Sequence, residues 1–139
     1  MIKELVTDEA LLTTPCEPAT TEDAAVAQDL LDTAASIDEI GCLAANQIGV
    51  TKAIAVYMDD QDVPHVIYNP KIKRALHAYR TTETCLTKEG ETKVTRYDSM
   101  TLAYDELVDG ELVPREINLQ GFTAELVQHA IDHCKGHYI

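Results

Sequence analysis

Basic residues are scarce in this sequence. Only 11 Lys and Arg stand against 24 Asp and Glu, which gives a formal net charge of −13 over 139 residues. Such a charge repels phosphate backbones and anionic lipid headgroups, so we expect no direct binding of nucleic acid. No apolar run approaches the length of a membrane span, and the amino terminus lacks a basic-then-apolar signal pattern. We therefore expect a soluble, cytoplasmic protein without a membrane partner.

The sequence also lacks closely spaced cysteines. Its four cysteines are scattered and form no Cys-x-x-Cys pair, being Cys16, Cys42, Cys85 and Cys134. This spacing argues against a dense disulfide framework and against a zinc ribbon. In a reducing cytosol we expect free thiols, unless one of the four binds a metal ion.

Repeats, low-complexity tracts and long Ser/Gly/Pro linkers are absent as well. A chain of this length has the size of one domain and can bury roughly two-thirds of its unfolded surface in one core. We therefore expect residues 1–139 to form a single domain.

The hydrophobic pattern predicts two helices. A helix-start signal at residues 20–23 precedes apolar residues at helical spacing, which predicts a helix over residues 21–37. A second helix is predicted from about residue 123 and should end near Gly136.

Short apolar runs rich in branched residues predict strands between these helices. The predicted strands cover residues 53–57, 66–68, 92–97, 100–104 and 112–119. The pair Asn69-Pro70 predicts a turn or chain break, and residues 108–111 (Val-Asp-Gly-Glu) predict a hairpin turn. Mostly antiparallel strands between two helices make an α+β domain.

Two histidines stand four residues apart in the predicted C-terminal helix. Residues i and i+4 of a helix lie on one face, so His129 and His133 can bind one metal ion. The hydrolytic form of this pattern is His-Glu-x-x-His, whose glutamate takes a proton from the attacking water. This chain has Ala130 in its place. Taken alone, the histidines fit a solvated or core-capping pair about as well as a metal site. Cys85 taken alone would by default be a small buried hydrophobe, and the histidine pair reverses that interpretation.

Three segments stand out together. They are residues 41–49 (Gly-Cys-Leu-Ala-Ala-Asn-Gln-Ile-Gly), residues 83–87 (Glu-Thr-Cys-Leu-Thr) and residues 128–133 (Gln-His-Ala-Ile-Asp-His). This trio resembles the peptide deformylase motifs Gly-x-Gly-Leu-Ala-Ala-x-Gln, Glu-Gly-Cys-Leu-Ser and Gln-His-Glu-x-Asp-His. The resemblance covers nearly the whole chain. It implies a peptide-deformylase-like fold, with antiparallel strands around a C-terminal metal-binding helix and an N-terminal helix.

Carried over residue by residue, the resemblance implies that Cys85, His129 and His133 bind one divalent metal ion, with water in the fourth position. Two imidazoles and one thiolate leave an open corner in a tetrahedral site, as catalytic zinc sites do. Iron(II), zinc, nickel and cobalt are all consistent with these donors. His137 continues the four-residue spacing, but it follows the expected helix end at Gly136, so we leave it out of the site.

The resemblance also implies roles for residues around the metal ion. The side-chain amide of Gln47 and the backbone N–H of Leu86 are expected to stabilise the oxyanion formed during acyl transfer. Glu83 is expected to orient the site from behind the ligands, and Asp132 to fix an imidazole through a hydrogen bond. Without the flanking motifs, a solvent-facing Gln47 and an exposed Glu83 would be the simpler interpretation.

The substrate peptide is expected beside Gly41, Cys42 and Leu43 of the first motif. Arg96 matches a family arginine beside the site and is assigned to substrate binding, although a surface salt bridge explains it equally well. Ile40 and Cys42 stand where the family motif has two glycines. Glycine at these positions would let the backbone approach a bound peptide closely. We therefore expect a narrowed or reshaped substrate groove.

The activity implied by the resemblance is removal of the formyl group from the N-terminal formylmethionine of nascent peptides. In the family, the glutamate that Ala130 replaces is the general acid and base, a role that contributes roughly 10²–10⁴ in rate. We therefore expect crippled turnover. A non-catalytic, metal-holding protein that binds peptide N-termini is the alternative, and a purely structural metal is a third. The oligomeric state and the origin of Ala130, native or engineered, stay open.

Overall fold

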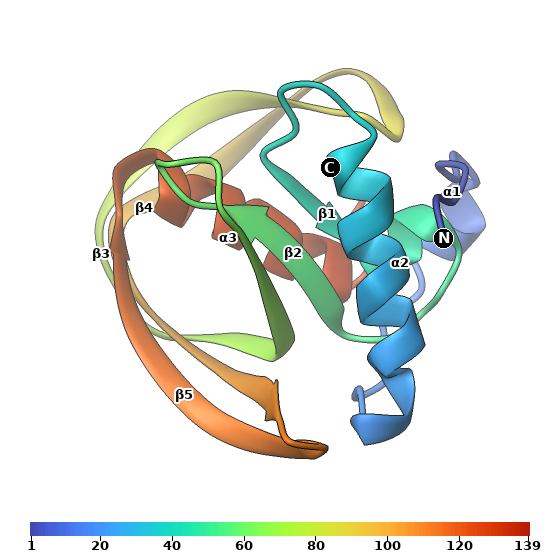
Figure 1. Ribbon diagram of the computed structural model, residues 1–139. Coiled ribbons are helices and arrows are strands. Elements are labelled where there is room, and N and C mark those ends of the chain that lie inside the picture. Colours follow the sequence, from blue (N-terminus) through green and yellow to red (C-terminus); the bar gives the residue numbers. More distant parts are fainter.

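The computed structural model describes residues 1–139 and is built on one five-stranded sheet (Figure 1). The strands follow the order β1-β2-β3-β4-β5, and every neighbouring pair is antiparallel. Their bounds are β1 Cys42–Ala44, β2 Ile54–Met58, β3 Pro64–Cys85, β4 Lys88–Val108 and β5 Glu111–Gln120. The α+β class expected from the sequence is confirmed.

Helical segments flank this sheet. Their bounds are α1 Glu9–Leu12, η1 Thr21–Asp23, α2 Ala24–Ala35, η2 Ala45–Ile48 and α3 Gly121–Cys134. A capping box of Thr20 and Asp23 opens η1, so the helix predicted over residues 21–37 is confirmed with slightly different ends. The predicted terminator Gly136 has a φ of 78° just beyond α3. None of these helices has the length and apolarity that crossing a membrane requires.

Strand β2 lies between two hydrophobic clusters because its side chains alternate between the faces of the sheet. Ala55 and Tyr57 pack in the cluster that contains residues of α3, whereas Ile54 and Val56 pack in the cluster that contains residues of α2. Figure 1 shows the long strands β3, β4 and β5 curving around α3, with α2 on the other side of β2. Helix α3 is therefore held in the concave side of the sheet.

The prediction of a chain break at Asn69-Pro70 is wrong. Strand β3 passes through this pair with a shift of register and continues to Cys85. Asn69 adopts a φ of 51°, and its side-chain amide is hydrogen-bonded to both the backbone N–H and the carbonyl of Ala19. The pair therefore marks a bulge tied to the N-terminal segment rather than a strand end.

The structure also joins two predicted strands. Residues 92–97 and 100–104 both belong to β4, and the apolar runs mark only parts of it. The short strand β1 and helix α1 were not expected. The hairpin turn predicted at residues 108–111 is confirmed, because Asp109 and Gly110 have φ values of 50° and 80°, as a two-residue hairpin turn requires.

Candidate active site

Three candidate ligands come together from two elements. Cys85 is the last residue of β3, and the two histidines project from successive turns of α3. The Nε2 atom of His133 lies 3.3 Å from Cys85 Sγ and 3.1 Å from His129 Nε2. All three donor atoms lie within 4.8 Å of one another. Two imidazole nitrogens and a sulfur converging on one point fit a divalent ion with an open fourth position.

The electrostatics of the cluster favour a thiolate. Burial raises the pKa of Cys85, but hydrogen bonds with His129 and His133 outweigh burial and bring it to about 5. Burial lowers the pKa of His129, whereas its bonds with Cys85 and Glu83 raise it to about 9. The thiolate is the form of cysteine that binds metal ions, whereas a protonated His129 must release its proton before its Nε2 atom can bind one.

A buried ion-pair network holds His129 from behind. Glu83 Oε1 lies 2.8 Å from His129 Nδ1, which leaves the Nε2 atom free to face Cys85. Arg96 donates two hydrogen bonds to Glu83, at 2.9 and 2.8 Å, and one to Asp132 at 2.6 Å. Burial raises the pKa of Glu83, but the bonds from His129 and Arg96 bring it to about 2. Glu83 is thus ionised at neutral pH and fixes one imidazole.

Three expectations change here. Arg96 is only 4% exposed, so its interpretation as a surface salt bridge is wrong. Nor does it line the cavity described below; its guanidinium instead joins the two carboxylates of the network. Asp132 contacts Arg96 and the Nδ1 atom of His137 rather than either candidate ligand. The buried Nδ1 atom of His133 has no hydrogen-bond partner.

The amide of Gln47 is directed at the cluster. Its Oε1 atom accepts a hydrogen bond from the backbone N–H of Ala44 at 2.9 Å, which orients Nε2 toward Cys85 Sγ at 3.3 Å. Nε2 also donates to Thr87 Oγ1 at 3.1 Å, and this hydroxyl lies 3.4 Å from the sulfur. Thr87 was missed from the sequence, although a hydroxyl residue closes the second motif. Leu86 follows Cys85 directly and lines the cavity that leads to the cluster.

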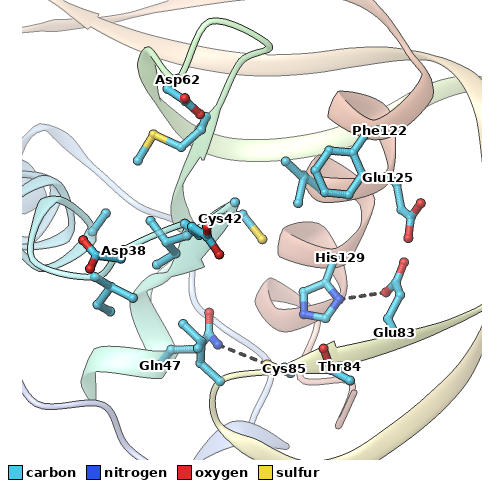
Figure 2. Close-up of a pocket in the computed structure, with 18 of the residues that line it drawn as sticks. Asp38, Cys42, Gln47, Asp62, Glu83, Thr84, Cys85, Phe122, Glu125 and His129 are labelled. Carbon is cyan, nitrogen blue, oxygen red and sulfur yellow. Dashed lines mark hydrogen bonds and ion pairs between the residues drawn. The ribbon is translucent and has the colours of Figure 1, made fainter.

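An open cavity of about 840 Å³ leads to this cluster (Figure 2). Its walls include residues from the segment before β1, from β1, from the end of β3 and from α3. Gly41 and Cys42 line it as expected, but the Leu43 side chain does not; it is fully buried in the cluster that contains α2. A Cβ atom at Gly41 would lie 2.4 Å from Leu126 on α3, so the wall is tight there.

Ala130 is fully buried and belongs to the hydrophobic cluster between α3 and the sheet. It does not line the cavity. The carboxyl groups that do line the wall near His129 are Glu83 and Glu125. Burial and the neighbouring Glu83 raise the pKa of Glu125, which also accepts a hydrogen bond from Tyr79 at 3.2 Å.

A curved antiparallel sheet around a helix, with two histidines from the helix and a cysteine from the sheet, defines a metal-dependent hydrolase. The family model of polypeptide deformylase matches residues 2–139, and the chain belongs to this family. The identification made from the three motifs is confirmed.

The chain covers different shares of the length of its known relatives. The peptide deformylase of Clostridium beijerinckii is 36% identical over 137 residues, which cover 98% of each chain. Peptide deformylase 2 of Vibrio cholerae is 37% identical over 111 residues, 78% of this chain but only 64% of that protein. The solved structure of a peptide deformylase from Legionella pneumophila has a TM-score of 0.83 at 29% identity, over 98% of this chain and 82% of that one.

Proposed function

We propose that this chain is a cytoplasmic, single-domain metalloamidase that removes formyl from the N-terminal formylmethionine of nascent peptides, and that Ala130 leaves it slow. The observation that carries the proposal is the convergence of Cys85, His129 and His133, with the Gln47 amide beside them, at one end of an open cavity. The metal ion would be iron(II), zinc, nickel or cobalt.

The residues around the cluster suit acyl transfer. A divalent ion held by the three ligands would supply Lewis-acid polarisation of the formyl carbonyl and acidify water. The Nε2 atom of Gln47 and the backbone N–H of Leu86 would donate hydrogen bonds to the oxyanion. Glu83 holds His129 through Nδ1 and so keeps Nε2 toward the ion. Strand β1 is the sheet edge beside the cavity, where a peptide backbone can pair.

The fully buried Ala130 favours a second candidate, a non-catalytic protein that holds a metal ion and binds peptide N-termini. Without a carboxylate to move protons, the chain would still bind a peptide but would no longer hydrolyse its formyl group. A purely structural metal is the least supported alternative, because only three donors converge and the cavity leads to them.

Formate release from formyl-Met-Ala-Ser by the metal-loaded chain separates these functions. We expect slow release that depends on the metal ion, disappears in Cys85→Ala and persists in the control Cys16→Ala, since Cys16 lies outside the cluster. If the chain binds the peptide but releases no formate, it is the non-catalytic binding protein. If it neither binds the peptide nor releases formate, the metal ion serves only the structure.

A further inference from the structure

Two of the four thiols lie outside the candidate active site and close to each other. Cys16 belongs to the segment between α1 and η1, and Cys134 is the last residue of α3. The backbone N–H of Cys16 donates a hydrogen bond to the carbonyl of Cys134 at 3.0 Å. With standard bond lengths, this contact keeps the two Cα atoms less than about 7 Å apart. Disulfides join Cα atoms that are roughly 4.4–6.8 Å apart, so the backbone places the pair within reach of a bridge.

The backbone around this contact is held in place. Glu17, the residue after the first cysteine, donates its N–H to the Thr51 carbonyl at 3.0 Å and accepts a hydrogen bond from Ala53 at 2.9 Å. Beyond α3, a Cβ atom at Gly136 would lie 2.8 Å from the backbone oxygen of Thr13, so the turn after the helix lies directly against the N-terminal segment. The backbone of the two cysteines is therefore already positioned for a bridge.

The two thiols differ in their access to solvent. Cys134 is only 8% exposed, whereas Cys16 is half-buried between the exposed residues Pro15 and Glu17. Burial raises the pKa of the Cys134 thiol to about 12, and Cys16 is the only other group that contributes to this shift, which indicates that the two thiols lie near each other. Burial also raises the pKa of Cys16 to about 11, so this more accessible thiol is protonated at neutral pH and reacts slowly.

We propose that Cys16 and Cys134 are a modification site, at which a small disulfide such as oxidised glutathione converts the two thiols into an intramolecular disulfide. The deprotonated Cys16 sulfur attacks one sulfur of the oxidant, breaks its S–S bond and releases one reduced glutathione. The Cys134 sulfur, on losing its proton, attacks the Cys16 sulfur of the mixed disulfide and releases the second reduced glutathione. The chain gives up two electrons and two protons, and the oxidant takes them up as it becomes two thiols.

The bridge fastens the N-terminal segment to the end of α3, one residue beyond the candidate ligand His133. Because the two cysteines stand almost the whole chain apart, the bridge closes a very long loop, and such loops restrict the unfolded chain most. Neither thiol belongs to the cluster of candidate ligands, so the bridge leaves those three residues as they are. The oxidised chain is therefore more stable than the reduced one.

Mass spectrometry of the full chain after treatment with oxidised glutathione tests this proposal. Cleavage after Lys, Arg and Glu leaves each of the four cysteines on a peptide of its own. We expect the peptides of Cys16 and Cys134 to be joined, and the Tm of the treated chain to rise by about 10 °C. Dithiothreitol should separate the peptides and return the Tm to its starting value.

Cys16→Ser and Cys134→Ser should each give neither the joined peptides nor the rise in Tm. The matched control is Cys42→Ser, because Cys42 is also partly buried but lines the cavity, and it should behave as the unmodified chain does. Unmodified Cys16, glutathione on Cys16 without a bond to Cys134, or a bond from Cys16 to another cysteine would overturn the proposal. An equal rise of Tm in Cys16→Ser, or joined peptides without any rise, would overturn the stabilising effect of the bridge.

Discussion

At the scale of single residues, Ala130 and Cys42 separate this site from the full deformylase motif. Ala130 lies in the core cluster, and Cys42, in the place of a motif glycine, lines the cavity and packs against that cluster. Burial raises the pKa of the Cys42 thiol to about 12, so it stays protonated at neutral pH and cannot replace the missing base. Neither Ala130 nor Cys42 therefore supplies a group that moves protons at neutral pH.

The ligand assignment makes a direct prediction at this scale. The purified chain should carry about one divalent ion, and Cys85→Ala should lose it, because the thiolate is one of only three converging donors. Elemental analysis of the two proteins measures this. Cys16→Ala, whose thiol lies elsewhere, should keep the ion. Full occupancy in the Cys85→Ala protein would show that the ligands are assigned wrongly.

At the scale of elements, the β3–β4 hairpin and α3 build the site together. The sequence predicted both main helices, because their apolar residues recur with helical period, and it predicted β2 and β5 from short apolar runs. It missed most of β3, where the side chains beyond residue 70 are largely exposed and leave no apolar signal. The contacts of Arg96 depend on strand register and on packing against α3. The contacts of Thr87 depend on where η2 lies relative to the end of β3. Local sequence does not encode contacts between segments far apart in the chain. The motif residues themselves could be identified directly from the sequence.

Arg96 links these elements, because it joins Glu83 on β3 to Asp132 on α3. Its removal in Arg96→Met should lower the free energy of unfolding by about 3–5 kcal/mol, since two carboxylates lose their buried cation. Urea denaturation of the full chain measures this loss.

The matched control for Arg96→Met is Arg115→Met, which breaks the exposed pair with Glu106 and should cost less than about 1 kcal/mol. Equal losses in the two variants would mean that the buried network contributes no more than a surface pair.

At the scale of the whole molecule, the sheet wraps around α3 and leaves the edge strand β1 beside an open cavity (Figure 1). Cys85, His129 and Gln47 lie together at one end of this cavity (Figure 2). The central claim is therefore that a deformylase site persists here without its proton-transfer group.

Formate release by the Ala130→Glu variant, with and without Cys42→Gly, tests that claim most directly. A glutamate at a fully buried position needs room to reach the cavity, and the Cys42 thiol packs against the same cluster, so the double variant should respond most. With the metal ion fully bound, its kcat on a formyl-Met peptide should exceed that of the unmodified chain by roughly 10²-fold or more, with little change in peptide affinity. Release no faster than that of the unmodified chain would contradict the claim, and the non-catalytic binding protein would take its place.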